Sequence, residues 1–497
     1  YIGDIIKTED DLLVQTPEKF KERFNIDVRI KQEVIKIDKE KKKLQIKNKA
    51  TGEIYIENYD KLVLSPGAEP INPFKGVKSD RIFTIRNVKD AEKVKTFIEN
   101  NNPKSAVIVG GGYIGVEMAE NLSEYTMEVS IVEKAPHLIS IIDNDMAHFI
   151  HKEIKKHGVK VYVNEGVNKI EEHEKLLLTL DNGKIETDLV ILCIGVRPET
   201  NLAEESGINT NEKGAIIVNN KMQTSNKDIY ALGDAVEVKN TITGERNGIA
   251  LAGPANRQAR IVANNINGIE SSYEGFIGSS ILKIFNYSLG IVGLSERACK
   301  NLDIPYKIMI ISPYSHATYY PGAKMLTIKA IYNSKTSQIL GAYVWGKSSV
   351  DKITDILSVA IQNKMGAADI SALELCYAPP YSSAKSPVNI LGNAIENEMN
   401  ELVDTIAVEE LKNKENLYIL DVRTIEEYNI SHIEGAINIP LDELRENIEK
   451  LDKSKEIIVH CHSGLRSYLA CRILKQKGYN VKNLIGGYIM YDIMKNK

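Results

Sequence analysis

The stretch AVIVGGGYIG, residues 106–115, decides the fold of the sequence around it. Its four leading apolar residues have the length and composition of a strand buried on both faces of a parallel sheet. The glycines that follow have the spacing G-x-G-x-x-G, and a helical pattern continues to about Glu124. Gly110 permits a tight turn, Gly112 lets the backbone approach a pyrophosphate, and Gly115 allows close helix–strand packing. The sequence therefore predicts a dinucleotide-binding βαβ unit.

An acidic residue ends the next expected strand, residues 128–133. Glu133 stands where a carboxylate would accept hydrogen bonds from the adenosine ribose hydroxyls. Its charge would repel a 2′-phosphate, so NADH is expected rather than NADPH. Lys134 beside it weakens this preference and keeps NADPH as an alternative.

A second short apolar strand, residues 229–232, ends on Gly233 and Asp234. In flavoproteins with two dinucleotide-binding domains, such a strand directs its terminal Asp at the ribityl chain of FAD. That arrangement normally follows an N-terminal strand and Gly-rich loop, whereas no Gly-rich loop precedes Gly110 here. We therefore expect the first βαβ unit of the FAD half to be missing from this sequence.

Composition narrows the classes of partner. The 497 residues predict three or four domains, and 43% hydrophobic with 26% charged residues is typical of a soluble globular protein. The 63 basic and 67 acidic residues leave no basic excess for nucleic acid. The longest apolar run, residues 189–196, is too short to span a membrane. Five scattered cysteines without a CxxC pair indicate a reduced, cytoplasmic protein. No metal site is expected.

Periodicity and turn residues predict further elements along the chain. A polar linker is expected at residues 396–402. The expected strands are residues 27–30, 43–46, 61–64, 280–285 and 325–332, and the expected helices are residues 255–267 and 349–363, with hairpin turns at 51–52 and 181–183.

The order of several motifs resembles the pyridine-nucleotide disulfide oxidoreductases. Those motifs are residues 64–68, 110–117, 195–198 and 230–234. Three further stretches, residues 1–3, 315–322 and 377–385, are similar to the coenzyme A-disulfide reductases. The C-terminal module resembles the rhodanese domain that some members carry.

The resemblance implies an α/β fold of four parts. Two are Rossmann-like dinucleotide-binding domains, of which the FAD one is incomplete at its N-terminus. An α+β dimerisation domain and a C-terminal rhodanese-like α/β domain follow. The expected boundaries are 1–76 and 198–272 for FAD, 77–197 for NAD(P), 273–395 for dimerisation and 402–497 for rhodanese.

The resemblance also implies cofactor contacts. Tyr113 would lie over the nicotinamide pocket, with Glu117 behind it. Tyr377 would reach FAD across a homodimer interface. The other implied FAD-site residues are Ser65, Pro66, Gly67, Gly233, Asp234 and Ala252, and Gly195 is a further implied cofactor-binding residue.

The same resemblance implies a site for coenzyme A. Tyr319 and Tyr377 would face the redox thiol of the other subunit as phenolic donors. In the family that redox cysteine sits a few residues before the position equivalent to Tyr1 and forms a mixed disulfide with coenzyme A. The implied substrate contacts are Asn256, Lys385 and, on weaker grounds, Arg23.

Residues 456–466 hold a second active-site pattern. A buried strand ends at Cys461, and the loop after it enters a helix near Ser467. Backbone N–H groups and the helix N-terminus would stabilise a thiolate there, and Arg466 would strengthen the effect. Such a thiolate can accept sulfane sulfur as a persulfide. With residues 421–423 and 432–440, this loop resembles an active rhodanese rather than an inactive adaptor.

We therefore expect a homodimeric FAD enzyme that uses NADH to reduce coenzyme A disulfide, coenzyme A persulfide or polysulfide. Cys461 would carry sulfane sulfur for it. Two alternatives stay open. One is an NADH oxidase or peroxidase on the same scaffold, and the other is a redox-inactive protein that acts only as a sulfur carrier.

Overall fold

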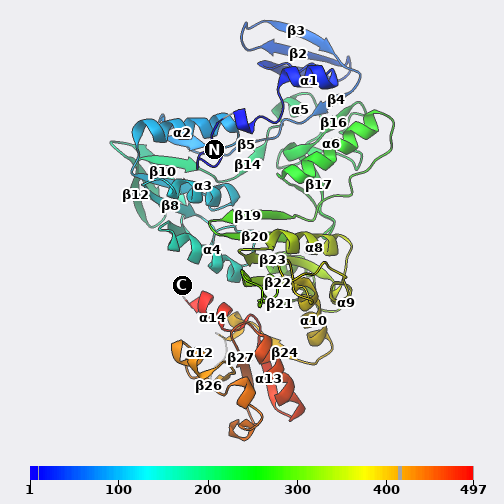
Figure 1. Ribbon diagram of the computed structural model, residues 1–497. Coiled ribbons are helices and arrows are strands. Elements are labelled where there is room, and N and C mark those ends of the chain that lie inside the picture. The colour runs from blue at the N-terminus through cyan, green and yellow to red at the C-terminus, as the bar shows by residue number, and fades with distance from the viewer. Residues whose placement is uncertain (9, 412–416, 496–497) are drawn as a thin grey trace. The chain divides into compact units, whose positions relative to one another are not determined.

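The computed structural model describes residues 1–8, 10–411 and 417–495, and the chain divides into two compact units (Figure 1). Unit 1 comprises Tyr1–Ala135 and Gly158–Phe276, and unit 2 comprises Pro136–His157 and Ile277–Lys497. Both units combine helices with parallel or antiparallel sheets, which confirms the predicted α/β class.

A five-stranded parallel sheet forms the first half of unit 1, in the order β6-β13-β7-β8-β9. Strand β7 is buried because Ala106 to Val109 face protein on both sides, and α3 starts directly after its glycine loop. The predicted strand–loop–helix is therefore confirmed. These strands are β6 (Ile82–Thr84), β7 (Ser105–Val109), β8 (Glu128–Glu133), β9 (Lys160–Val163) and β13 (Leu189–Leu192), beside α2 (Val88–Asn101) and α3 (Tyr113–Ser123).

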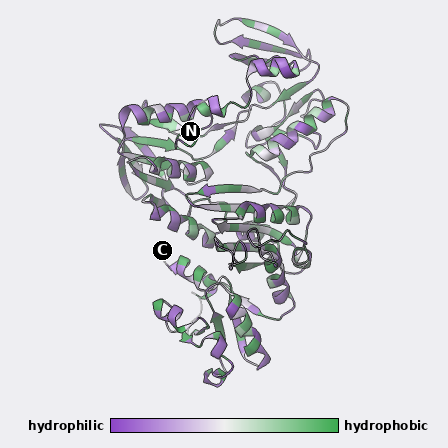
Figure 2. Cartoon of the chain, in the orientation of Figure 1, coloured by the Kyte–Doolittle hydropathy of each residue, from purple (hydrophilic) through white to green (hydrophobic). Residues whose placement is uncertain are grey.

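A three-stranded meander covers this sheet with an apolar face. Leu176, Leu178 and Leu180 alternate inward and pack with Val107 and Val190. In Figure 2, α2 carries both green and purple residues, as expected for a helix that buries one face through Val94 and Ile98. The meander consists of β10 (Val167–Glu172), β11 (Leu176–Leu180) and β12 (Gly183–Thr187).

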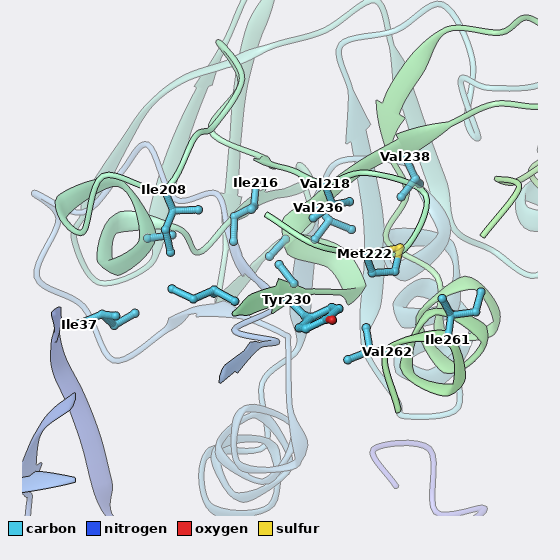
Figure 3. Close-up of a cluster of buried hydrophobic side chains, with 14 of the residues drawn as sticks. Ile37, Ile208, Ile216, Val218, Met222, Tyr230, Val236, Val238, Ile261 and Val262 are labelled. Carbon is cyan, nitrogen blue, oxygen red and sulfur yellow. The ribbon is translucent and has the colours of Figure 1, made fainter. Parts of the chain in front are cut away.

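The second half of unit 1 is built around the parallel pair β4 (Leu62–Leu64) and β16 (Ile229–Ala231). Tyr230, Met222 and two residues of α6 (Ala252–Ile266), Ile261 and Val262, belong to one apolar cluster, shown in Figure 3. Burying each such aliphatic side chain stabilises the fold by roughly 1.5–3 kcal/mol. The remaining elements of this half are α1 (Pro17–Phe24), β1 (Gln32–Asp38), β2 (Lys43–Asn48), β3 (Ile54–Asn58), β5 (Ala68–Pro70), β14 (Val196–Pro198), α5 (Asn201–Glu205), β15 (Ile216–Ile217), β17 (Val236–Lys239) and β18 (Arg246–Gly248).

One predicted strand is wrong. Residues 27–30 form no strand, and the first strand of the hairpin, β1, begins at Gln32. Ile30 remains 64% exposed, and Lys31 adopts a left-handed φ of 57° that interrupts an extended chain. The apolar residues that suggested a strand therefore have no sheet to pack against in unit 1.

Unit 2 contains an antiparallel sheet in the order β19-β20-β23-β22-β21. Helix α8 packs on β20 and β23 through Ile353, Leu357 and Ile361, spaced to share one helix face. The elements are α4 (Asn144–Lys156), β19 (Ser280–Ile284), β20 (Tyr287–Gly293), α7 (Glu296–Asn301), β21 (Tyr306–Ile311), β22 (Leu326–Asn333), β23 (Ile339–Gly346), α8 (Val350–Gln362), α9 (Ala367–Ser371) and α10 (Pro387–Met399).

The expected polar linker at residues 396–402 is also partly wrong, because α10 continues to Met399. Glu398 is 8% exposed and accepts hydrogen bonds from Lys307, Tyr332 and Thr405. A carboxylate with three donors is satisfied in the interior, so a polar sequence here forms buried structure.

The C-terminal module of unit 2 is a parallel sheet in the order β24-β28-β27-β25-β26. Its core includes Leu420, Val459, Leu474 and Val481. None of the helices in the described parts of the chain is long and apolar enough to cross a membrane. The module's elements are β24 (Asp404–Ile406), α11 (Val408–Leu411), β25 (Tyr418–Asp421), α12 (Ile425–Ile430), β26 (Ile437–Asn438), β27 (Glu456–His460), α13 (Leu465–Gln476), β28 (Asn480–Leu484) and α14 (Gly487–Lys495).

Candidate active sites

The glycine loop after β7 leaves an open space at the start of α3. Gly110 has φ of 104°, and a Cβ there would lie 2.4 Å from the carbonyl oxygen of Cys193. A Cβ on Gly115 would lie 2.0 Å from the oxygen of Gly110. Gly112, by contrast, has an ordinary φ of −75°, and a Cβ there would meet no atom within 4 Å. Two glycines are thus needed for packing, while the third leaves room for a ligand.

Glu133 lies beside this loop at the end of β8. Its Oε2 accepts a hydrogen bond from the Gly111 N–H at 2.5 Å, and its Oε1 accepts one from the Ala135 N–H at 2.7 Å. No side-chain cap hydrogen bond is made at Gly112, the N-cap residue of α3, and a helix N-terminus of this kind favours an anion. Tyr113 and Glu117 occupy the first and second turns of α3. These residues fit a nicotinamide dinucleotide, with the carboxylate placed for a ribose.

The expected flavin residues meet at the carboxyl ends of β4 and β16. Leu64 pairs with Ala231, so the loop 65–67 and Gly233 leave the sheet at the same edge. This is the edge at which parallel sheets bind ligands. Asp234 forms an ion pair with Arg86 at 2.8 Å, and the Gly233 N–H donates to Gln258 at 2.8 Å.

Other expected residues of the flavin half surround this edge. Gly195 accepts a hydrogen bond from the Ile71 N–H at 3.0 Å, next to the β5–β14 pair. Ala252 is the first residue of α6, and Asn256 donates to its carbonyl at 3.0 Å. The backbone edge and the acidic Asp234 fit FAD. Arg86, which binds Asp234, was not found from the sequence, because no motif connects residues so far apart.

In unit 2, the two tyrosine stretches lie together. The Ala317 N–H donates to Ser382 O at 3.2 Å, which joins the two loops. The hydroxyls of Tyr319 and Tyr377 are 3.1 Å apart. Their side chains are exposed, at 74% and 49%. The hydrogen bond with Tyr377 raises the pKa of Tyr319, so the Tyr319 phenol stays neutral near neutral pH.

The remaining predicted substrate residues are exposed. Lys385 follows the Tyr377 loop in unit 2. Arg23 lies on α1 of unit 1 with its guanidinium 6.0 Å from the Phe24 ring. Among the described residues, neither Lys385 nor Arg23 contacts another predicted site residue. Their roles in binding coenzyme A therefore stay predictions.

The loop after β27 forms a cradle around the sulfur of Cys461. The Gly464 N–H points at Sγ from 3.1 Å, and the Ser467 hydroxyl lies 3.5 Å away. The carbonyls of Cys461 and His462 turn outward and accept hydrogen bonds from the first turn of α14. Gly464 has φ of 104° and begins α13. The loop therefore presents one backbone donor and one hydroxyl to the sulfur, and two carbonyl acceptors to α14.

Arg466 does not stand alone at this loop. It makes a bidentate ion pair with Glu427 of α12, at 2.6 and 2.7 Å. This pair lowers the pKa of Glu427 to about 2. Glu427 was missed from the sequence, although the pattern Thr-x-x-Glu at 424–427 correctly indicates the helix start that holds it.

A buried network lies behind the cradle. Arg423 binds Asp421 at 2.6 Å, and its guanidinium lies 4.2 Å from the Tyr488 ring. Burial lowers the pKa of His460 to about 4, so this histidine is neutral at neutral pH. The network holds the strand ends that carry Cys461.

One acidic cluster in unit 2 could suggest a cation site. Asp143, Asp145 and Glu296 bring carboxylate oxygens close together. Lys329 fills the centre, at 2.7 Å from Asp145 and 3.3 Å from Asp143, and it also binds Glu296. Burial lowers the pKa of Lys329, but the three carboxylates raise it more, which keeps the ammonium form. We call this group the Lys329 cluster.

The other cysteines differ from Cys461. Burial raises the pKa of Cys193 and of Cys299 to about 12, and it raises that of Cys471 further. These three stay protonated near neutral pH, and Cys299 and Cys471 are buried while Cys193 is half-buried. Cys376 is exposed.

Three family models match this chain. Residues 4–259 match "Pyridine nucleotide-disulphide oxidoreductase" and residues 279–387 match its dimerisation domain. Residues 405–491 match "Rhodanese-like domain". Together these matches cover the glycine loop after β7, the flavin edge, the tyrosine pair and the Cys461 cradle.

Named relatives support the same assignment. The coenzyme A disulfide reductase of Staphylococcus aureus strain NCTC 8325 is 35% identical over 79% of this chain and 88% of its own length. The crystal structure of reduced Bacillus anthracis CoADR-RHD is 44% identical, with a TM-score of 0.95 over 99% of this chain and 89% of that one. An NAD-dependent persulfide reductase from A. fulgidus is 33% identical, with a TM-score of 0.93 over 99% and 91%.

Proposed function

The chain belongs to the pyridine nucleotide-disulphide oxidoreductase family, and from this premise we propose that it is an FAD-dependent, NADH-driven reductase of sulfur–sulfur bonds. Its substrate class is coenzyme A disulfide, coenzyme A persulfide or polysulfide. Two of its relatives, which match over 79% and 99% of its length, are named as a coenzyme A disulfide reductase and an NAD-dependent persulfide reductase.

Different residues of the chain would bind the cofactors and assist sulfur transfer. The space at Gly112 and the Glu133 carboxylate would bind the pyrophosphate and ribose of NADH. The edge formed by residues 65–67 with Asp234 would hold FAD. FAD, when bound, accepts hydride and passes two electrons toward sulfur. Tyr319 and Tyr377 would donate hydrogen bonds to a leaving sulfur.

The observation that carries the persulfide part is the Cys461 cradle. A thiolate held by backbone donors accepts sulfane sulfur and releases it again, whereas reduction of a simple disulfide needs no such carrier. A homodimer is part of the proposal, because residues 279–387 match a dimerisation domain and the tyrosine pair is exposed.

The test is anaerobic NADH oxidation by the purified yellow protein, with coenzyme A persulfide and coenzyme A disulfide as separate substrates. We expect turnover with both and a higher kcat/KM for the persulfide. A large preference for the disulfide would contradict the persulfide part. Rapid oxygen consumption without any sulfur substrate would favour an NADH oxidase, and a colourless preparation would favour a sulfur carrier alone.

A further inference from the structure

The charges next to the Cys461 sulfur cancel in pairs. Arg466 is the cationic side chain of the loop, and both of its terminal nitrogens bind the carboxylate of Glu427. Behind the loop, Arg423 is likewise bound by Asp421. A half-buried His462 has its pKa lowered by burial, so it adds no charge near neutral pH. The charged side chains that contact the loop therefore add almost no net positive charge.

Two exposed apolar side chains lie near this ion pair in sequence, beside the acidic Glu426. Leu465, between Gly464 and Arg466, is 65% exposed, and Ile425, two residues before Glu427, is 56% exposed. They offer hydrophobic contact to an entering molecule and no attraction for an anion.

Net charge decides which sulfur donor can approach a thiolate. Thiosulfate is a dianion, and it must come within bonding distance of the anionic sulfur of Cys461. Without a surplus cation, this approach is repulsive. A persulfide of an organic thiol has at most one negative charge at its reacting end.

We propose that Glu427, by neutralising Arg466, makes the Cys461 site select sulfane sulfur carried by organic thiols and reject thiosulfate. Glu427 is thus a specificity-determining residue. The inference rests on the proposed role of Cys461 as sulfur carrier, and it concerns the substrate class of that site.

The two competing transfers balance without an external oxidant or reductant. With a persulfide, the Cys461 thiolate attacks the terminal sulfur of RS–SH, the S–S bond breaks, and RS⁻ leaves with the electron pair. Cys461 becomes Cys–S–SH. With thiosulfate, the same attack forms Cys–S–S⁻ and releases sulfite as SO₃²⁻. The two routes differ in the charge of the donor, of the leaving group and of the product as first formed.

The test compares Glu427→Gln with wild type in the full-length protein. The glutamine keeps the size of the side chain and an oxygen that can accept the Thr424 N–H, which Glu427 binds at 3.1 Å. Glu426→Gln is the matched control, because it removes a charge from the same helix while leaving the Arg466 pair intact. The persulfide on Cys461 is measured as a 32 Da mass increase, with thiosulfate or glutathione persulfide as donor.

We expect E427Q to raise the rate of loading by thiosulfate relative to glutathione persulfide by roughly tenfold, as one unmasked charge at a half-exposed site allows. The control E426Q should leave this ratio at the wild-type value. An unchanged or lower ratio in E427Q would overturn the proposal. Loading needs neither NADH nor flavin, so it succeeds or fails independently of the reductase activity.

A second measurement needs no variant. Wild-type Cys461 is alkylated with anionic iodoacetate and with neutral iodoacetamide at increasing salt. Without a surplus cation, the iodoacetate rate should hold or rise as salt screens the repulsion. A steep fall of that rate with salt would reveal an attractive positive site and would overturn the proposal.

Discussion

Replacing Gly112 by alanine should weaken NADH binding without harming the fold. The backbone at Gly112 has φ of −75° and ψ of −169°, which alanine adopts easily. The added methyl would touch no protein atom within 4 Å, so folding has little reason to change. The methyl would instead occupy the space into which we expect the pyrophosphate to enter.

The magnitude follows from the contacts that would be lost. A hydrogen bond from a backbone N–H to a charged phosphate contributes roughly 1.5–3 kcal/mol. If the methyl displaces the phosphate from one such donor, about 2 kcal/mol is lost, or roughly a thirtyfold rise in KM for NADH. Steady-state kinetics gives this value, and calorimetric titration with NAD⁺ gives an independent dissociation constant.

Two further glycines provide controls. Gly76→Ala also adds a methyl that meets nothing within 4 Å, but outside the loop, so its KM should stay at the wild-type value. Gly115→Ala places a methyl 2.0 Å from a backbone oxygen and should lower the melting temperature as well. A Gly112→Ala enzyme with wild-type stability and a KM within about twofold of wild type would refute the assigned phosphate site.

Three more predictions follow from charges and hydroxyls in unit 2. Lys329→Met should destabilise the protein by roughly 3–5 kcal/mol, seen as a lower melting temperature, because the Lys329 cluster then keeps uncompensated buried carboxylates. Burial lowers the pKa of His151 and of His460 to about 4. The unfolded chain therefore binds more protons below about pH 6.5, and stability should fall between pH 6.5 and 4, by up to about 3 kcal/mol per histidine. A melting temperature that is flat over this range would contradict it. Tyr319→Phe and Tyr377→Phe should each lower kcat with coenzyme A disulfide roughly tenfold or more, and the double variant little further, since the two hydroxyls share one hydrogen bond. Additive losses would show that the hydroxyls act separately.

The parts of the sites that depend on local chain geometry could be predicted from the sequence. A glycine spacing after a buried strand dictates a turn, and the position of Glu133 follows from the next strand. The same holds for Cys461, because the end of a buried strand and the start of a helix lie within seven residues of it. These predictions needed no knowledge of distant contacts.

The failures share a physical cause, which is that burial depends on distant residues. Residues 27–30 have the composition of a strand, but they find no neighbouring strand and remain largely exposed. Glu398 has a polar sequence around it, yet Lys307 and Tyr332 satisfy it inside the protein. The residues next to 27–30 and next to Glu398 in the sequence do not indicate whether such distant partners exist.

The electrostatic role of Arg466 also depends on a residue that is distant in sequence, Glu427. From the sequence, the charge of Arg466 is expected to help stabilise the thiolate of Cys461. The bidentate contact with Glu427 offsets most of this positive charge. The Gly464 N–H points at Sγ from 3.1 Å, so a backbone dipole faces the sulfur in addition to Arg466. The ion pair of Arg466 with Glu427 holds the loop against α12. We expect a site whose positive charge is offset in this way to repel a second anion.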